Sequence, residues 1–435
     1  MRLVIIGGGG FRVPLIHREL VRRPELGVTE LVLYDAHPER LTVIAAVLGH
    51  GAGPSVRLAA TLPDALAGAD FVFSAIRMGG LAGRAADERR ALRLGLIGQE
   101  TVGAGGLAYA LRTLPAALRL ARMVAEQAPR AWLVNFTNPA GLVTEASRSV
   151  LGDRVIGICD SPAALVERAR RAVSAPAAVA DYAGINHLGW LRSLTSDGID
   201  RLPGLLADPD ALASFEEGRL FSPAQLATLG ALPNEYLYFY YHSRQVVTAL
   251  QRGGTRGEHL AAEQAAFYRE ALAEPARAAE LWEQTRLRRE RSYFAEARTA
   301  ERDEADLAGG GYERVALRLM QALAGGGDAE LILNVANRAT FPPLPPELVV
   351  ETVCAVGPAG ARPLPAAPFT VHQLGLIGSV RAAEQAVLAA ATTGSYDAAV
   401  HGFTVHPLIA DEQLARQLLD DLLTDVPTLL DQLGR

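Results

Sequence analysis

Short apolar runs alternate with longer amphipathic stretches along the first third of the chain. The apolar runs have the length of buried strands and read RLVII (2–6), TELVLYDA (29–36), ADFVFSAI (69–76), AWLVNFT (131–137) and RVIGICD (154–160). Between them, apolar residues recur at helical spacing, most clearly over 14–23 and 107–127. Strands that alternate with helices are typical of a mostly parallel sheet covered on both faces. We therefore predict an α/β fold with a doubly wound parallel sheet of the Rossmann type.

The pattern loosens beyond residue 165. Further elements are expected as a strand pair over 181–194, an aromatic-rich helical stretch over 224–250, and strands over 329–337 and 347–357. We predict a first domain over 1–165 that binds a dinucleotide. A second lobe over 166–435, α/β or α+β in class, is expected to pack tightly on it.

Composition narrows the possible partners. The 435 residues carry a net charge of −6 and a pI near 5.9, which excludes a nucleic-acid-binding footprint. Uninterrupted apolar runs fall short of the roughly 18 residues that span a bilayer, so we expect no membrane segment. The two cysteines, Cys159 and Cys354, cannot build a disulfide framework, which favours a cytoplasmic location.

The chain contains no lysine, because all 42 lysine and arginine positions are arginine. This excludes Schiff-base catalysis and a Walker-A phosphate loop, which both need a lysine amine. Anions must then be bound by guanidinium groups, backbone N–H groups or helix N-termini.

Glycines follow the first predicted strand and precede the first predicted helix. Gly7, Gly8 and Gly9 would let the backbone approach a pyrophosphate at the helix N-terminus. Asp35 ends the second strand, where a carboxylate binds the adenosine ribose and repels a 2′-phosphate, so NAD is favoured over NADP. A G-x-G-x-x-G register from Gly7 places Arg12 at the third glycine position, which leaves a plain tight turn as the alternative.

Polar side chains follow three of the predicted strands, and the carboxyl ends of parallel strands share one edge of a sheet. Arg84 belongs to a group of arginines just after the strand at 69–76, where a guanidinium could bind a carboxylate or phosphate. The alternative is that these arginines only form the solvated start of a helix. Asn135 and Asn138 end the strand at 131–137, where Asn135 could face the cofactor and Asn138 the cleft. Cys159 ends the strand at 154–160.

A metal site could form around Cys159 and His187. Thiolate and imidazole suit a borderline divalent cation with open coordination positions, although two unrelated core residues would give the same pattern. Asn186 precedes the histidine. Tyr236 opens an aromatic cluster in which packing competes with a role as a base beside a cation.

Five segments resemble glycoside hydrolase family 4, and above all its 6-phospho-β-glucosidase branch. They occur in the family's order and spacing over nearly the whole chain: GRAADERRALRLGLIGQETVGAGGLAYALRTLP (83–115), NFTNPAGLVTEA (135–146), GICDSP (157–162), GINHLGW (184–190) and GSYDAAVHGFTVHPL (394–408).

The resemblance implies a Rossmann-type fold shared with lactate and malate dehydrogenases, together with NAD and Mn²⁺ or another divalent cation. In the reaction it implies, NAD⁺ removes a hydride from C3 of the sugar, a base removes the C2 proton, the C1 substituent leaves, and water and hydride are added back.

The resemblance also implies the roles of the site residues. These are Cys159 and His187 as metal ligands, Tyr236 as the C2 base, Arg84, Asn138 and Asn186 at the substrate, and Gly7, Gly8, Gly9 and Asp35 at the cofactor. The 166–435 lobe would carry substrate, metal and oligomer contacts.

Some positions depart from the family pattern. Relatives read GGGSSYTPE where this chain reads GGGGFRVPL, and NTRNNG where it reads NVANRA, so an arginine associated with the 6-phosphate is Ala336 here. Arg338 or Arg12 would then have to bind the phosphate. Asp160 follows the metal cysteine, where α-acting members have an acid that serves as proton donor, and we expect it to be the general acid.

We therefore expect a cytoplasmic hydrolase of phosphorylated or plain β-glucosides that forms a homodimer or homotetramer. An α-acting family member is one alternative. An NAD-dependent 2-hydroxy acid dehydrogenase, which needs neither metal nor Cys159, is another, and a non-catalytic NAD-binding sensor is the third.

Overall fold

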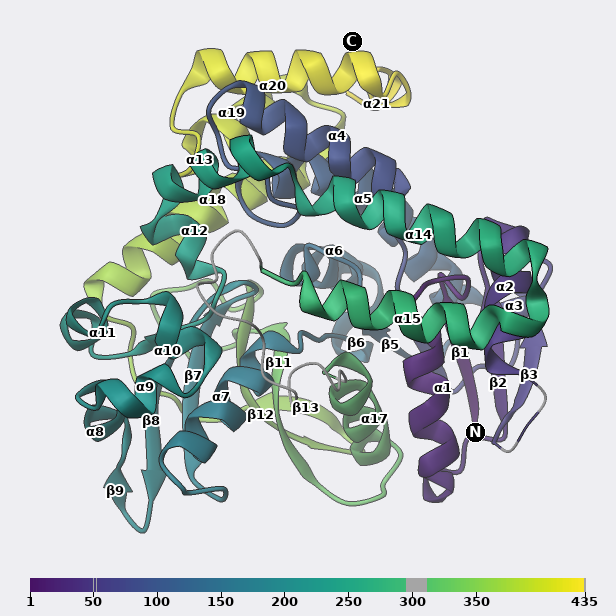
Figure 1. Cartoon of the computed structure of the whole chain (residues 1–435), viewed down its shortest axis with the longest axis horizontal. Coiled ribbons are helices and arrows are strands. Elements are labelled where there is room, and N and C mark those ends of the chain that lie inside the picture. The colour runs from purple at the N-terminus through teal and green to yellow at the C-terminus, as the bar shows by residue number, and fades with distance from the viewer. Residues whose placement is uncertain (50, 52, 295–310, 434–435) are drawn as a thin grey trace.

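One continuous sheet runs through the molecule in the computed structural model, which describes residues 1–49, 51, 53–294 and 311–433 (Figure 1). It has 13 strands, and its main path follows the order β10-β8-β7-β12-β11-β6-β5-β4-β1-β2-β3. The bounds are β1 (Arg2–Ile6), β2 (Glu30–Tyr34), β3 (Ser55–Leu58), β4 (Phe71–Ser74), β5 (Trp132–Asn135), β6 (Val155–Gly157), β7 (Val179–Ile185), β8 (Leu188–Ser196), β9 (Ile199–Asp200), β10 (Leu232–Pro233), β11 (Ala329–Ala336), β12 (Val349–Gly357) and β13 (Gly360–Pro363).

Helices cover both faces of the sheet. In the first half they are α1 (Val13–Arg22), η1 (Pro24–Leu26), α2 (Pro38–Leu48), α3 (Leu62–Leu66), α4 (Gly80–Arg93), α5 (Gly103–Gln127), α6 (Ala140–Leu151), η2 (Gly152–Arg154) and α7 (Ser161–Ala172). Later in the chain come α8 (Leu202–Leu206), α9 (Pro209–Ala213), α10 (Glu216–Leu220), α11 (Pro223–Leu229), α12 (Leu237–Tyr241), α13 (Ser243–Gly253), α14 (Arg256–Ala273), η3 (Pro275–Arg277), α15 (Ala278–Arg291), α17 (Tyr312–Leu323), α18 (Val371–Thr393), α19 (Tyr396–Val405), α20 (Glu412–Asp425) and α21 (Thr428–Gln432).

The amino-terminal half of the sheet is parallel. Strands β3, β2, β1, β4, β5 and β6 pair in parallel in that order, which is the arrangement of a dinucleotide-binding fold. Apolar runs form these strands because helices bury both faces of the sheet, so that every residue of β4 is buried. The predicted doubly wound α/β fold is confirmed.

The second lobe extends the same sheet. β11 runs antiparallel to β6, with Asn334 opposite Gly157, and β12, β7, β8 and β10 continue antiparallel from there. The predicted strand pair over 181–194 corresponds to β7 and β8. The predicted domain boundary at residue 165 falls inside α7, which packs against β8 and β11, and the division into two domains stays a prediction.

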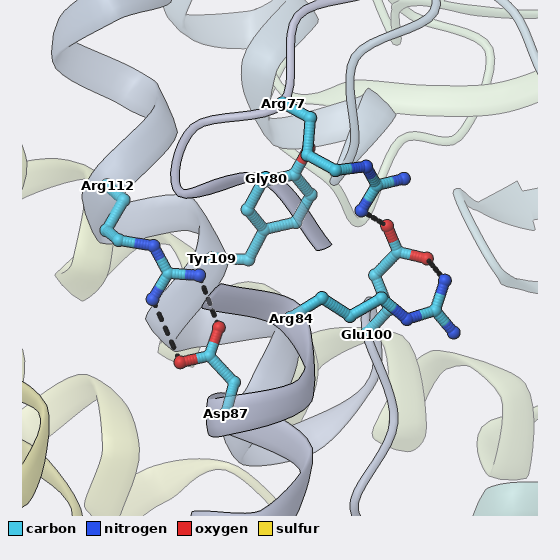
Figure 2. A pocket seen from close by; sticks show the side chains of 7 residues that line it. All are labelled: Arg77, Gly80, Arg84, Asp87, Glu100, Tyr109 and Arg112. Atoms are coloured by element: carbon cyan, nitrogen blue, oxygen red, sulfur yellow. Dashed lines mark hydrogen bonds and ion pairs between the residues drawn. The ribbon is translucent and has the colours of Figure 1, made fainter. Parts of the chain in front are cut away.

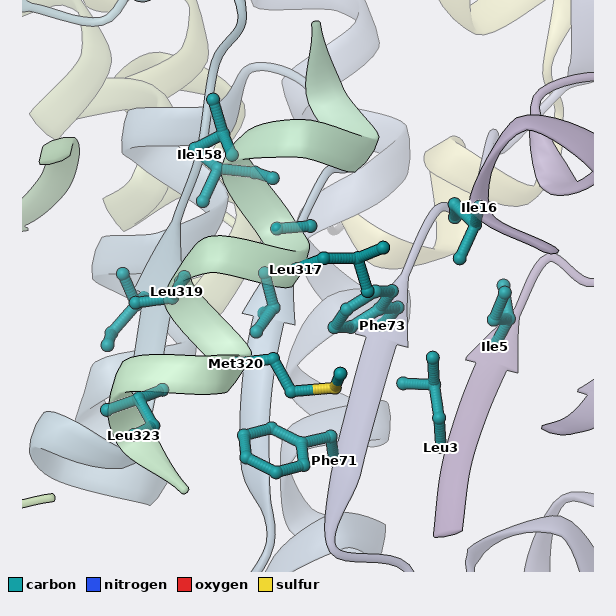
Figure 3. Packing of buried hydrophobic residues seen from close by; sticks show 14 of the residues in the cluster. Leu3, Ile5, Ile16, Phe71, Phe73, Ile158, Leu317, Leu319, Met320 and Leu323 are labelled. Atoms are coloured by element: carbon teal, nitrogen blue, oxygen red, sulfur yellow. The ribbon is translucent and has the colours of Figure 1, made fainter. Parts of the chain in front are cut away.

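A large part of the core links distant parts of the chain. The buried side chains of Leu317 and Met320 on α17 belong to one cluster with Phe71 and Phe73 on β4 and with Leu3 on β1 (Figure 3). Each such large apolar side chain contributes roughly 1.5–3 kcal/mol when fully buried. The second lobe is thereby packed onto the parallel half by hydrophobic contact as well as by sheet pairing.

Helix α18 is long and apolar enough to cross a membrane, judged by length and composition alone, and a third of its most apolar stretch is buried inside the structure. It packs against α5 and α19 and buries Arg381, whose guanidinium is paired with Glu145 and Glu384.

Close packing at Gly157 gives a test of how the two halves are joined. A Cβ added there would overlap Thr144 Oγ1 and lie 2.9 Å from Asn334 Cβ. We expect Gly157→Ala to lower the free energy of unfolding by about 1–3 kcal/mol, measured by urea denaturation. Gly204→Ala in α8, where nothing lies within 4 Å of the added carbon, is the control, and its stability should be unchanged or higher by up to about 1 kcal/mol. Equal effects of the two substitutions would contradict this account.

Candidate active site

The turn after β1 brings the backbone close to its neighbours. The N–H groups of Gly7 and Gly8 both donate to the carbonyl oxygen of Tyr34, at 2.9 and 2.8 Å. Gly7 has a φ of +90°, and a Cβ there would lie 2.5 Å from the carbonyl oxygen of Ala75. At Gly9 an added Cβ would lie 2.6 Å from Arg40 Cβ. Only glycine fits these positions, and α1 begins directly after the turn, as a pyrophosphate site requires.

Asp35 ties this turn to the end of β2. Its Oδ2 accepts the N–H of Gly9 at 3.0 Å and its Oδ1 accepts the N–H of His37 at 3.0 Å. Two helices from the second lobe close over the turn. Tyr268 on α14 donates its hydroxyl to the carbonyl of Gly9 at 2.6 Å, and Trp282 on α15 donates Nε1–H to the carbonyl of Phe11 at 2.8 Å. Tyr268 and Trp282 contact this turn across more than 250 residues of sequence, a distance at which a local pattern gives no signal.

Cys159 lies just beyond the end of β6 and is buried. Its Sγ lies 3.7 Å from the hydroxyl of Ser161. Burial raises the pKa of the thiol well above its ordinary value, and the negative charges of Glu351 and Asp160 raise it further. Cys159 is therefore a thiol in the structure as it stands, and a cation beside it would be needed to favour the thiolate.

His187 occupies the turn between β7 and β8. Its Nδ1 lies 2.8 Å from the hydroxyl of Thr101, whereas its Nε2 is buried without a hydrogen-bond partner. Burial lowers the pKa of His187 to about 3, so the ring is neutral. A neutral imidazole with one nitrogen oriented by a hydrogen bond and the other open is the form that ligates a metal.

Tyr236 connects these two residues. Its ring stacks on His187 with centroids 3.7 Å apart and planes 5° from parallel. Its hydroxyl lies 3.4 Å from that of Tyr293, which in turn donates to the buried Glu235. Burial raises the pKa of Tyr236, the neighbouring Glu235 raises it further, and Cys159 would do so if it were a thiolate. Tyr236 thus contacts one predicted metal ligand and lies within electrostatic reach of the other.

These residues fit a divalent cation with open positions. The described part of the chain holds no group of three or more His, Cys, Asp or Glu side chains that could bind a metal. Cys159 and His187 can then supply only two donors, which leaves the other positions to a ligand. The unpartnered Nε2 of His187 is the observation that favours a metal here.

Asp160 is half-buried at the start of α7. Its Oδ2 lies 3.6 Å from Nη1 of Arg12, whose guanidinium also lies 4.9 Å from the centre of the Tyr312 ring. Burial raises the pKa of Asp160 more than the charge of Arg12 lowers it. The carboxyl group therefore holds its proton more readily than an exposed aspartate, as a general acid must.

Asn138 and Asn186 lie on neighbouring segments. Asn138 precedes Pro139 through a cis peptide bond, and its Oδ1 is buried without a hydrogen-bond partner. Asn186 Oδ1 accepts the N–H of Ala140 at 3.1 Å. Asn135 is buried, and its amide bonds Thr137, Ala140 and Thr144 and holds the turn after β5. Its contact with the cofactor stays a prediction.

Arg84 is buried in a network of ion pairs on α4. Its Nε contacts Glu88 at 2.8 Å. Its Nη1 contacts Glu100 at 2.5 Å, while Arg77 binds the other oxygen of Glu100 (Figure 2). Burial alone would raise the pKa of Glu100, but the two guanidinium groups lower it to about 2. Beside them, Arg112 pairs with Asp87 across the same pocket (Figure 2).

Arg338 lies apart from this site. It follows β11, which runs antiparallel to β6, so its guanidinium pairs with Asp153 before β6 at 2.7 Å. Cys159 lies beyond the opposite end of β6. The prediction of Arg338 as a substrate contact is therefore corrected, because the direction of β11 places it at the other edge of the sheet.

Several residues at the site were not assigned a role from the sequence. They are Glu100 and Thr101 after α4, Arg289 and Tyr293 at the end of α15, and Glu351 in β12. The first two lie within the GQET segment that carried the family resemblance, which was the available signal. A second hollow extends from Asn186 and His187 to Glu384 on α18 and His406 after α19.

Comparisons with known proteins show the family of this chain. The model of the family 4 glycosyl hydrolases matches residues 2–175, and the model of that family's C-terminal domain matches residues 182–409. A probable 6-phospho-β-glucosidase of Bacillus subtilis (strain 168) is 29% identical over 444 residues, which covers 97% of this chain and 96% of the relative. The 6-phospho-β-glucosidase of Escherichia coli (strain K12) is 29% identical over 453 residues, covering 97% of this chain and 94% of the relative.

Solved structures of similar proteins share the fold over nearly their whole length. The 6-phospho-β-glucosidase of Thermotoga maritima with NAD and glucose-6-phosphate superposes with a TM-score of 0.83 at 25% identity, covering 99% of both chains. A 6-phospho-α-glucosidase from gut microorganisms in complex with NAD and Mn²⁺ gives a TM-score of 0.81 at 25% identity, covering 98% of both chains. Because the two family models match both halves of the sequence, the chain belongs to family 4 of the glycosyl hydrolases.

Proposed function

We propose that this protein hydrolyses 6-phosphoglucosides, with preference for the β-anomer, and that it uses NAD and Mn²⁺ or a similar divalent cation. The observation that carries the proposal is the stack of Tyr236 on His187, with Cys159 within electrostatic reach and Nε2 of His187 unpartnered. A candidate base is thus stacked on a candidate imidazole ligand, and we infer that the thiol of Cys159, just beyond the carboxyl end of β6, completes the cation site. Family membership and the NAD and glucose-6-phosphate bound in the Thermotoga structure support the assignment.

Each residue then has a distinct role in the proposed reaction. Gly7, Gly8, Gly9 and Asp35 hold the dinucleotide, and Cys159 and His187 hold the cation. When bound, the dinucleotide supplies reversible oxidation at C3 of the sugar and the cation stabilises negative charge on the sugar oxygens. Tyr236 takes the proton from C2, Asp160 donates a proton to the leaving oxygen, and Asn138, Asn186 and Arg84 position the sugar.

The 6-phosphate would be bound by arginines near Asp160. Arg289 at the end of α15 is half-buried, and burial together with the charges of Arg12, Arg256 and Arg84 lowers its pKa to about 9. Crowded guanidinium groups are stabilised by a bound dianion, and their planar donors suit phosphate. Arg12 and Arg289 take the place of the arginine that relatives have where this chain has Ala336.

An α-acting enzyme is the second candidate, and Asp160 is the observation that favours it. An acid directly after the proposed metal cysteine resembles the α-acting pattern, and the relatives of this chain include the 6-phospho-α-glucosidase 1 of Lacticaseibacillus paracasei. The dehydrogenase alternative is not retained, because the chain belongs to a hydrolase family.

We also propose a cytoplasmic homodimer or homotetramer in which α18 forms part of the contact. One side of this helix is exposed and uncharged. Val371 is 92% exposed, and Gly375, Gly378, Ser379 and Ala382 follow on the same exposed side. Small residues allow two helices to approach closely, and Gly378 lacks any neighbour within 4 Å of an added Cβ.

Removing the Tyr236 hydroxyl tests the base. We expect Tyr236→Phe to lower kcat by about 10²–10⁴-fold, because general-base catalysis contributes that much. A C2-deuterated substrate should also keep its label, which NMR can follow. Tyr238→Phe, at a half-buried position in the first turn of α12, is the matched control and should retain activity and exchange. Unchanged exchange in Tyr236→Phe would exclude this tyrosine as the base.

Metal removal tests the two proposed ligands. Chelation should abolish turnover of the wild type, and added Mn²⁺ should restore it. We expect Cys159→Ser to weaken Mn²⁺ binding, measured by electron paramagnetic resonance. The loss of affinity should be at least roughly 10–100-fold, because changes to outer-shell partners of metal ligands already cost that much. Cys354 is buried in β12, and its Sγ–H donates a hydrogen bond to the carbonyl oxygen of Thr352. Cys354→Ser is therefore the control and should bind Mn²⁺ normally. Activity that survives chelation would remove Cys159 and His187 from the reaction.

Nitrophenyl α- and β-glucosides, with and without a 6-phosphate, test the substrate class. We expect Arg289→Gln to raise KM for the preferred phosphorylated substrate about 10–100-fold, since a hydrogen bond to a charged group contributes about 1.5–3 kcal/mol. KM for the plain glucoside should not change. Arg338→Gln is the matched control and should leave KM unchanged. An increase of KM in Arg338→Gln but not in Arg289→Gln would assign the phosphate site to Arg338 instead.

A further inference from the structure

Strand β12 carries a carboxylate in the middle of the sheet. Glu351 is 1% exposed and lies between Asn334 of β11 and Gly184 of β7 in the strand register. A buried carboxylate is strongly unfavourable unless its oxygens accept hydrogen bonds. The partners of Glu351 therefore show what its charge is used for.

Three donors surround this carboxylate. Oε1 accepts the amide Nδ2–H of Asn334 at 2.8 Å and that of Asn186 at 3.2 Å, while Oε2 accepts the hydroxyl of Tyr182 at 3.3 Å. Two of the donors, Asn334 and Tyr182, lie within strands that the sheet already holds in place. Asn186 does not, because it follows the last residue of β7, Ile185.

Asn186 passes this constraint to two segments of the candidate active site. Along the chain it is followed by His187, and through space its Oδ1 accepts the N–H of Ala140, which opens α6 after Asn138 and Pro139. The side chain is thus fixed at both ends, by Glu351 on its nitrogen and by Ala140 on its oxygen. One amide connects the histidine turn to the asparagine turn.

The histidine turn requires such an anchor. His187 has a φ of +63°, in the left-handed region, which costs a non-glycine residue roughly 1–2 kcal/mol. A residue in that conformation keeps it only when its surroundings determine it. Thr101 orients the ring through Nδ1, and the bond from Asn186 to Glu351 holds the backbone just before it.

We propose that Glu351 is a positioning residue: by holding Asn186 it sets the His187 turn and the Asn138 segment in the arrangement that binds a divalent cation. The inference rests on the proposed function of Cys159 and His187 as cation ligands. It goes beyond that function because Glu351 acts from the centre of the sheet, through Asn186, without contact with the cation.

A double-mutant cycle on the full-length protein tests this inference, with Mn²⁺ alone as the probe and electron paramagnetic resonance as the readout. Glu351→Leu keeps a similar size but removes both acceptor oxygens, so the amide of Asn186 loses this partner. We therefore expect Mn²⁺ affinity to fall about 10–100-fold, as is usual for outer-shell partners of metal ligands. Asn186→Ala should cause a similar loss, and the double variant should lose no more than either single variant. Additive losses would overturn the inference.

Asn334→Ala separates positioning from plain stability. It removes another donor of the same carboxylate without touching Asn186, so it should lower Tm while leaving Mn²⁺ affinity unchanged. A Glu351→Leu protein that is folded and binds Mn²⁺ as the wild type does would overturn the proposal. If Glu351→Leu does not fold, Asn186→Ala alone decides, because retained affinity there also overturns it. A wild type that fails to bind Mn²⁺ would instead contradict the proposed function itself.

Discussion

The meeting of β6 with β11 is the constraint on which the rest of the structure depends. At Gly157 and Asn334 the parallel half of the sheet passes into the antiparallel half, and the absence of a side chain at Gly157 lets Thr144 and Asn334 close over it. Cys159 lies two residues beyond this point on one half, and Glu351 lies opposite Asn334 on the other. The two halves of the candidate site are therefore held together by strand register.

The protein presents its donor groups in their uncharged forms. Burial keeps the thiol of Cys159 and the phenol of Tyr236 protonated and the imidazole of His187 neutral. A divalent charge placed among them would reverse the preference of the thiol and the phenol, since a nearby cation favours the anionic forms. Burial suppresses the ionisation of these groups when no cation is present. It also strengthens the effect of a bound cation on their ionisation, because charges interact more strongly away from water.

Local patterns in the sequence were enough to predict five of the six parallel strands, the glycine turn and the residues at the carboxyl edge. The edge strand β3 was missed because none of its residues is fully buried and it forms no apolar run. Buried strands are continuous apolar runs, and tight turns need glycine, so both leave a mark within a few residues. Arg338 was misplaced because its position depends on the direction of β11, which a local pattern does not contain. The turn hydrogen bonds of Asn135 were not predicted for a related reason, since a local pattern does not show that a side chain at a strand end bonds its own turn. Glu351 was missed because its segment was interpreted only as an apolar run that predicts a strand, and that pattern assigns no role to one charged residue within the run.

The left-handed backbone at His187 sets protein stability against chemistry at one position. Glycine would adopt that φ without strain, so an effort to select more heat-resistant variants would be drawn to this turn. Every gain made there would delete the imidazole ring and, with it, the stacking surface for Tyr236. A thermostable descendant obtained in that way would keep the fold and lose its chemistry.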